Sequence, residues 1–165
     1  VPRYEIWMES EAVLEMWNAL AGSGAVPCGV SAVEQLRILE GTPAYGIDIV
    51  DRDLPQETNQ MRALNFSKGC YLGQEIVERI RSRGSVHRTL SGFLLESSPP
   101  SQKTPVLSAD KPVGELTSVA RISIPAIGER VVALGHIRRE ALDSKEVLTA
   151  DGIAVTPCAL PFALL

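Results

Sequence analysis

The sequence feature that most limits how this chain can fold is the octet Lys68-Gly69-Cys70-Tyr71-Leu72-Gly73-Gln74-Glu75. Its two glycines allow backbone conformations that are closed to other residues. From Gln74 onward the pattern becomes helical, because apolar residues recur at helical spacing and charged residues fill the positions between them. The octet therefore predicts a polar loop that turns into a helix at Gln74.

Cys70 precedes this predicted helix start, where unpaired backbone N–H groups and the helix dipole favour a negative charge. Lys68, two residues earlier, favours the thiolate form in the same way. The octet thus offers Cys70 as a candidate working thiol and Lys68 as the residue that activates it. An isolated cysteine is more often a small buried hydrophobic residue, so the thiol alone leaves both interpretations open.

The 165 residues are enough for one sizeable core or two small ones. A formal charge of -4 indicates neither a nucleic-acid-binding protein nor a protein that binds an acidic membrane surface. Three widely spaced cysteines, Cys28, Cys70 and Cys158, predict a reducing, cytoplasmic setting without a disulfide framework. The histidines, His87 and His136, lie far apart in sequence, so no metal site is expected.

A basic run extends from Arg79 to Arg88 without an acidic residue. Three of its arginines, Arg79, Arg81 and Arg83, fall on the predicted helix and form a candidate face for an anion or a partner. A solvated helix face is the more common cause of such a run.

Ahead of the octet the pattern predicts a strand, a helix, a loop and a second helix. Tyr4–Met8 alternates as a strand, and Ser10 is the expected N-cap of the first helix. A second helix is expected to begin at Ser31, where Glu34 completes a capping box, and to end at Gly41. The apolar stripe of the first helix consists of Val13, Met16, Trp17 and Leu20. We expect this stripe to face a core rather than a ligand.

Residues 42–67 are rich in turn formers and show no sustained period. A loop this long is usually functional or disordered, and its place directly before the octet favours a functional one. After Gly84 the pattern changes to short strands, which predict a small barrel or sandwich. The expected strands are Leu90–Glu96, Val106–Leu107, Gly114–Val119, Val131–Ile137 and Ile153–Val155.

The octet resembles the signature Lys-Gly-Cys-Tyr-x-Gly-Gln-Glu of the YgfZ-like folate-binding proteins, which are relatives of the glycine cleavage T-protein, an aminomethyltransferase. Every fixed position of that signature matches here. Further elements of the chain are similar to the same superfamily, namely Leu36-Arg37, Glu40-Gly41, Pro43, Tyr45-Gly46, Leu54–Glu57 and Gly114–Ser118. The family's glutamate usually comes two residues after the arginine, whereas here Leu39 holds that place and Glu40 follows.

The resemblance implies an α+β fold in two parts. Residues 1–88 would be the later part of a ferredoxin-like folate-binding domain, and residues 89–165 a small antiparallel β-barrel. It also implies a longer chain with a portion ahead of Tyr4 that contributes to the folate channel. The implied cofactor is tetrahydrofolate.

Two further residues are site candidates through the resemblance. Arg37 matches an arginine that contacts folate, and a guanidinium can hold a carboxylate bidentately. From the residues alone, a salt bridge with Glu34 or Glu40 explains Arg37 equally well. Glu5 stands where the family has an acid after an aromatic residue, and an acid suits the amino-pyrimidine edge of a pterin. The remaining octet residues would shape the loop or orient a ligand, and these are Gly69, Tyr71, Gly73, Gln74 and Glu75.

The resemblance supports three hypotheses of function. The first is a tetrahydrofolate-binding protein that supports the synthesis or repair of iron-sulfur enzymes, including a tRNA-modifying one, with Cys70 as the working thiol. Its partners would be those enzymes or their assembly proteins, without direct binding to nucleic acid or membrane. The second is an aminomethyltransferase that moves a one-carbon unit to tetrahydrofolate, although T-proteins lack the octet's cysteine. The third is a folate-gated scaffold without turnover, for which the basic run would be the docking face.

Overall fold

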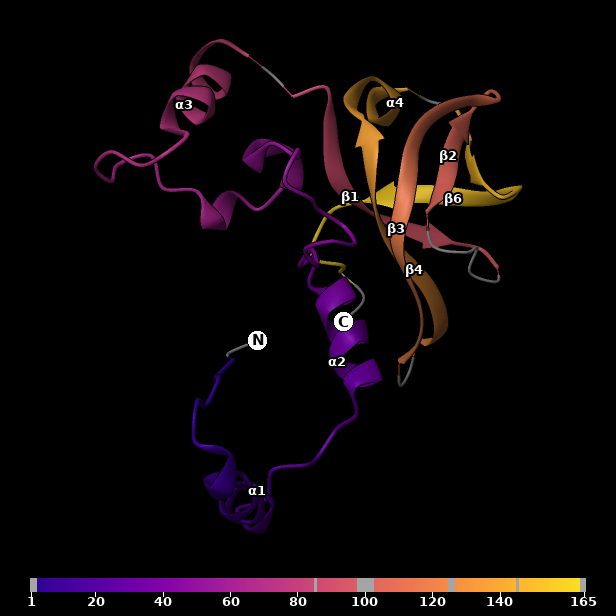
Figure 1. Cartoon of the computed structure of the whole chain (residues 1–165). Helices are drawn as coiled ribbons and strands as arrows, with labels where there is room; N and C mark the ends of the chain where they lie inside the picture. The colour runs from indigo at the N-terminus through magenta and orange to yellow at the C-terminus, as the bar shows by residue number, and fades with distance from the viewer. Residues whose placement is uncertain (1–2, 85, 98–102, 125–126, 145, 164–165) are drawn as a thin grey trace. The chain divides into compact units, whose positions relative to one another are not determined.

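The computed structural model describes residues 3–84, 86–97, 103–124, 127–144 and 146–163, apart from the side chain of Arg83. The chain forms two compact units, Val1–Val33 and Glu34–Leu165 (Figure 1). None of the helices in the described part of the chain has the length and apolar character needed to cross a membrane.

The N-terminal unit is built around helix α1 (Val13–Gly22), which follows a 3-10 turn, η1 (Ser10–Ala12). The predicted strand at Tyr4–Met8 is wrong, because residues 3–9 have no regular structure. A strand needs a neighbour for its backbone groups, and no strand is present among the described residues of this unit. Ser10 lies inside η1 rather than at an N-cap, and its Oγ donates to Glu11 Oε1 at 3.2 Å.

The apolar stripe of α1 does not form a core. Trp17 is 54% exposed, Val13 and Leu20 are also exposed, and Met16 is half-buried. The prediction of a buried stripe is therefore wrong for this chain. The physical reason is that one helix and its flanking turns supply no second apolar layer.

The second unit contains the predicted antiparallel barrel. In the described residues, six strands close in the order β1-β4-β3-β2-β5-β6, and all pairs are antiparallel. The strands are β1 (Arg88–Leu95), β2 (Thr104–Ser108), β3 (Lys111–Ile124), β4 (Gly128–Arg138), β5 (Leu148–Ala150) and β6 (Ile153–Cys158). The five expected strands are confirmed. Strand β5 was not expected, because three residues are too short to show a period.

Both faces of strand β4 are buried. Val131 and Ala133 belong to the core cluster around Phe93, whereas Val132 and Leu134 belong to a second cluster that includes Ile38 of helix α2. Alternate residues of a strand point to opposite faces, so the strand has apolar cover on each side. This explains the unbroken apolar run in the sequence. A short helix, α4 (Arg139–Asp143), follows β4 and contributes Ala141 to the first cluster.

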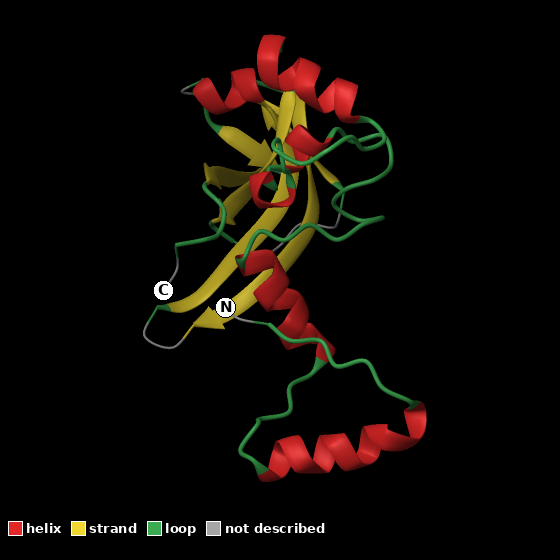
Figure 2. Ribbon diagram, turned by 90° about the vertical axis from the view of Figure 1, so that its left-hand side faces the viewer, coloured by secondary structure: helices red, strands yellow, loops and turns green. Residues whose placement is uncertain are grey.

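Helix α2 (Val30–Leu39) lies along the hairpin of β3 and β4 in its residues from Glu34 onward (Figure 2). Gln35 Nε2 donates to the backbone oxygen of Arg121 at 3.3 Å. The helix begins one residue before Ser31, so Ser31 is inside it, and the predicted capping role of Ser31 and Glu34 is wrong. The carboxylate of Glu34 instead binds Arg37, its neighbour one turn later on the helix.

The segment between α2 and the barrel carries two 3-10 turns, η2 (Pro55–Thr58) and η3 (Met61–Ala63), and then helix α3 (Gln74–Arg83). The prediction that a helix begins at Gln74 is confirmed. Gly73, the N-cap, has a φ of 86°, a left-handed conformation that favours glycine. Among the described side chains of this helix, that of Val77 is the buried one, at 4% exposure.

Candidate functional site

The octet loop is held by side-chain bonds to its own backbone. Asn65 Oδ1 accepts the backbone N–H groups of Ser67 and Lys68, at 2.9 and 3.1 Å, and so fixes the entry to the octet. Gln74 Oε1 accepts the backbone N–H of Tyr71 at 3.2 Å. The amide of Gln74 therefore orders the turn directly before α3.

The structure brings Lys68 and Tyr71 together. The ammonium nitrogen of Lys68 lies 4.5 Å from the centre of the Tyr71 ring, a cation–π contact. Cys70 between them is exposed, and the neighbouring Leu72 is fully exposed. The loop thus presents a thiol that a partner or an electrophile can reach, on a segment fixed at Asn65 and at Gln74.

The basic run is divided between two elements. On α3, Arg79 is exposed, whereas the guanidinium of Arg81 lies 4.4 Å from the centre of the Phe66 ring. Arg88 belongs to β1, and its Nη2 donates to Asp53 Oδ1 at 2.5 Å. The side chain of Arg83 lies outside the described residues. Within the described part of the basic run, the exposed arginines are therefore Arg79 and Arg81 of α3.

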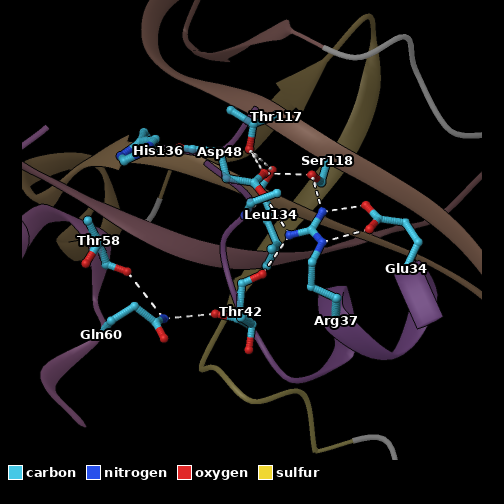
Figure 3. A network of polar contacts seen from close by, with 12 residues as sticks. Glu34, Arg37, Thr42, Asp48, Thr58, Gln60, Thr117, Ser118, Leu134 and His136 are labelled. Carbon is cyan, nitrogen blue, oxygen red and sulfur yellow. Dashed lines mark hydrogen bonds and ion pairs between the residues drawn. The ribbon is translucent and has the colours of Figure 1, made fainter. Parts of the chain in front are cut away.

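Arg37 is the centre of a polar network that joins α2 to the barrel (Figure 3). Its Nε and Nη2 donate to the two carboxylate oxygens of Glu34, at 2.8 and 2.5 Å. Its Nη1 donates to Thr42 O at 2.6 Å and to Asp48 Oδ2 at 2.7 Å. The second hydrogen of Nη2 is directed to Ser118 Oγ at 2.8 Å. A guanidinium has five N–H donors, and all five of Arg37 have acceptors.

Asp48 is the buried partner in this network, with a side chain that is 0% exposed. Besides the Arg37 bond, its Oδ2 accepts the backbone N–H of Ala44 at 2.8 Å. Its Oδ1 accepts from Ser118 Oγ at 2.7 Å and Thr117 Oγ1 at 2.5 Å. Four hydrogen bonds, one of them from the Arg37 cation, thus compensate the cost of burying this charge.

The two carboxylates flank one guanidinium but differ in their surroundings. The Glu34 side chain is 47% exposed, whereas that of Asp48 is inaccessible. The hydrogen bond from Arg37 lowers the pKa of Glu34, and the bond to Glu34 is the main cause of a raised pKa for Arg37. The salt bridge of Arg37 with Glu34, which the sequence offered as one interpretation, is present.

The sequence reasoning missed Asp48 and His136 as members of this network. His136 Nε2 donates to the backbone oxygen of Asp48 at 2.8 Å. A polar pocket of about 350 Å³ lies beside these residues, and Arg52 and Lys103 also line it. One signal was available, because Asp48 comes two residues after the Tyr45-Gly46 element. Nothing local in the sequence, however, connects it with the strands that carry Thr117 and His136.

The folate candidates fall in different units. Glu5 is an exposed residue of the N-terminal unit, and Arg37 belongs to the second unit. The Glu5 carboxylate can accept hydrogen bonds from an amino-pyrimidine, and a guanidinium is a group that can hold a carboxylate, but all five donors of Arg37 have acceptors within the chain. No three His, Cys, Asp or Glu side chains in the described ranges are grouped so as to hold a metal ion.

Comparison with known proteins gives three kinds of match. Residues 83–162 match the model of the C-terminal β-barrel domain of CAF17. A chloroplastic protein of Arabidopsis thaliana, described only as a transferase, is 31% identical over 152 residues, which are 88% of this chain and 33% of that protein. An aminomethyltransferase of Symbiobacterium thermophilum is 32% identical over 139 residues, which are 81% of this chain and 36% of the enzyme.

The fold is similar to a solved structure, that of the glycine cleavage system aminomethyltransferase T from Bartonella henselae. The TM-score is 0.72 at 19% sequence identity, over 92% of this chain and 43% of the solved one. The chain spans about a third of the length of the curated relatives that it matches.

Proposed function

We propose a folate-linked function for this chain because it belongs to the glycine cleavage T-protein superfamily. The proposal is that the protein binds tetrahydrofolate and, like the YgfZ-like branch, supports the synthesis or repair of iron-sulfur enzymes, including a tRNA-modifying one. Bound tetrahydrofolate would supply a carrier for one-carbon units. The chain matches only part of each relative, so this activity is a proposal for the whole protein.

The observation that carries the YgfZ-like proposal is the octet, with its exposed cysteine directly before α3. We assign Cys70 the role of working thiol, as nucleophile, transient cluster ligand or redox partner. Lys68, held on the Tyr71 ring, would fix the loop that presents the thiol and assist its chemistry. Gly73 and Gln74 support these roles through the turn that they build, and Gly69 and Glu75 are proposed to complete the loop.

For the cofactor, Arg37 is proposed to hold a carboxylate of folate and Glu5 to accept from the pterin. We also propose that residues 1–88 are part of the folate-binding α+β domain and that residues 89–165 form the antiparallel β-barrel domain that follows it. The exposed apolar stripe of α1 supports the first part of this division, because such a stripe is stable in water only when another surface covers it.

Two other functions have support of their own. The name aminomethyltransferase on the Symbiobacterium relative favours one-carbon transfer to tetrahydrofolate as the second candidate. The exposed Arg79 of α3 favours a non-catalytic scaffold, in which the helix docks a partner. Replacing Arg79, Arg81 and Arg83 together with alanine should then abolish capture of the partner. Unchanged capture would contradict the scaffold hypothesis.

The test is calorimetric titration of the full-length protein with tetrahydrofolate, in the wild type and in Cys70→Ala. We expect both proteins to bind, because the thiol and the cofactor residues are separate. We expect Cys70→Ala to lose its support of the iron-sulfur tRNA-modifying enzyme, and the control Cys28→Ala, another exposed cysteine, to keep it. Absence of binding by the wild type would contradict the cofactor assignment. Aminomethyl transfer that survives Cys70→Ala would favour the second candidate.

A further inference from the structure

The guanidinium of Arg37 has two edges with different surroundings. Along one edge, Nη1 binds Thr42 O and the buried Asp48 carboxylate. Along the other edge, Nε and Nη2 bind both oxygens of Glu34 in the side-on bidentate geometry typical of arginine with a bound carboxylate. Glu34 therefore holds the position that a ligand carboxylate would take.

An incoming carboxylate cannot simply be added to this site. All five N–H donors of Arg37 are already used, and its charge is shared between Glu34 and Asp48. A third carboxylate would find no donor and would meet two negative charges. A ligand carboxylate can therefore reach Arg37 only in exchange for one of the two resident carboxylates.

The exchange is possible on one side only. Asp48 is inaccessible and is also bonded by Ala44, Thr117 and Ser118, so its removal would leave buried polar groups unpaired. Glu34 is 47% exposed, and Arg37 is the partner of its carboxylate among the described residues. The Arg37 side chain is 13% exposed but keeps its bonds to Thr42 and Asp48 when Glu34 leaves. An ion pair within one helix turn contributes little to stability, so the departure of the exposed Glu34 has a small cost.

We propose that Glu34 is an internal stand-in that occupies the carboxylate-binding edge of Arg37 and leaves when a ligand carboxylate binds there. The identity of that ligand rests on the proposed function, under which it is a carboxylate of the glutamyl part of folate. Glu34 competes with the ligand for the same two donors, and after leaving it stays tethered nearby as a repelling charge. It therefore lowers the affinity of the site while keeping Arg37 paired in the free protein.

The first test compares the full-length wild type with Glu34→Ala by calorimetry, using tetrahydrofolate and tetrahydrobiopterin, a pterin without a carboxylate. Glu34→Ala should bind tetrahydrofolate about two- to fivefold more tightly, which corresponds to the contribution of an ion pair within one helix turn, and should bind tetrahydrobiopterin with unchanged affinity. The matched control is Glu129→Ala, which removes an exposed glutamate paired with Arg121 at 3.1 Å and should change neither affinity. Unchanged or weaker tetrahydrofolate binding by Glu34→Ala would overturn the proposal.

The second test does not depend on folate. The Nε–H resonance of Arg37 is followed by NMR while glutarate is added, and in Glu34→Ala it should shift at lower glutarate concentration than in the wild type. If the wild type binds no tetrahydrofolate but glutarate acts in this way, the proposed function fails and the stand-in role of Glu34 stands. If tetrahydrofolate binds and Glu34→Ala alters neither titration, the stand-in role fails and the proposed function stands.

Discussion

Apolar side chains are buried in the barrel but exposed in the N-terminal unit. In the barrel, Phe93 and Leu134 are 0% exposed, whereas in the N-terminal unit Trp7 is 89% and Trp17 54% exposed. A closed barrel pairs all its strands and encloses its own interior, so burial needs no outside partner. A lone helix has no second layer. Apolar spacing thus indicates which face of an element is to be covered, but the covering surface has to come from elsewhere.

The barrel should be destabilised most where two strands approach too closely to admit a side chain. Strands β3 and β4 approach at Gly135, where an added Cβ would overlap the backbone oxygen of Glu115. Gly135→Val has to push the two strands apart, so we expect a loss above about 4 kcal/mol, enough to unfold most of the protein. Urea unfolding followed by circular dichroism measures this loss. A midpoint equal to that of the wild type would show that the barrel is more deformable than its closure indicates.

The matched change in the N-terminal unit is Gly22→Ala, at the end of α1. No atom lies within 4 Å of the added Cβ, so nothing has to move. We expect no loss of barrel stability, and a local gain of about 0.5–1 kcal/mol because alanine favours helix over glycine. A destabilised barrel in this variant would mean that the two regions depend on each other more than their burial suggests.

The next effect in size concerns the polar network that ties α2 to the barrel. Asp48→Ala leaves Arg37, Thr117 and Ser118 without their buried acceptor, and we expect a loss of about 3–5 kcal/mol in the free energy of unfolding. In a double-mutant cycle, Arg37→Ala added to Asp48→Ala should cost less than the sum of the single changes, because the two groups act as a pair. Additive losses would show that the ion pair does not hold this part of the molecule.

Truncation of single leucines compares the two regions directly. Leu134→Ala opens a cavity in a fully buried cluster and should cost about 2–5 kcal/mol. Leu20→Ala in α1 removes a side chain that is 41% exposed and should cost less than about 1 kcal/mol. Both values come from chemical denaturation of this chain. Equal costs would mean that α1 is covered in solution by a surface that its own unit does not supply.

The sequence predicted the elements whose signals are local. The helix start at Gln74 follows from Gly73 and the apolar spacing after it, and the run Val131–Ile137 marks a strand. The strand at Tyr4–Met8 failed because alternation over a few residues does not provide a pairing partner. The strand Leu148–Ala150 was not predicted, because its pairing with β2 and β6 rather than its own composition makes it a strand.

In the candidate site, too, only the features with local sequence signals could be predicted. The octet could be found because its residues are consecutive and its loop is ordered by its own side chains. The network around Arg37 could not, because Ser118 lies 81 residues away from it and Asp48 is brought in by the fold. The sequence shows Arg37 and the Thr117-Ser118 pair as separate elements, and it is the fold that joins them through the buried carboxylate of Asp48.

Alkylation of single cysteines should have the smallest effect on the fold. The rates of alkylation can be compared between Cys158 in the barrel and Cys70 on the octet loop. Burial raises the pKa of Cys158 to about 11, so at pH 8 only about one thiol in a thousand is ionised. Exposed Cys70 should react with iodoacetamide at least about tenfold faster than half-buried Cys158, as mass spectrometry of the labelled peptides would show. The rate of Cys158 should rise about tenfold per pH unit until the pH approaches 11, because the thiolate is the reactive form.

Exposed Cys28 is the internal reference for accessibility, and an unfolded cysteine peptide is the reference for activation. A Cys158 that reacts as fast as Cys28 would contradict its burial against the barrel. A Cys70 that reacts no faster than the peptide would remove the activated thiol from the proposed function while leaving the exposure of the loop intact. The two references therefore distinguish two effects on the alkylation rate. Comparison with Cys28 measures how far the fold restricts access to Cys158, and comparison with the peptide measures how far the octet activates Cys70.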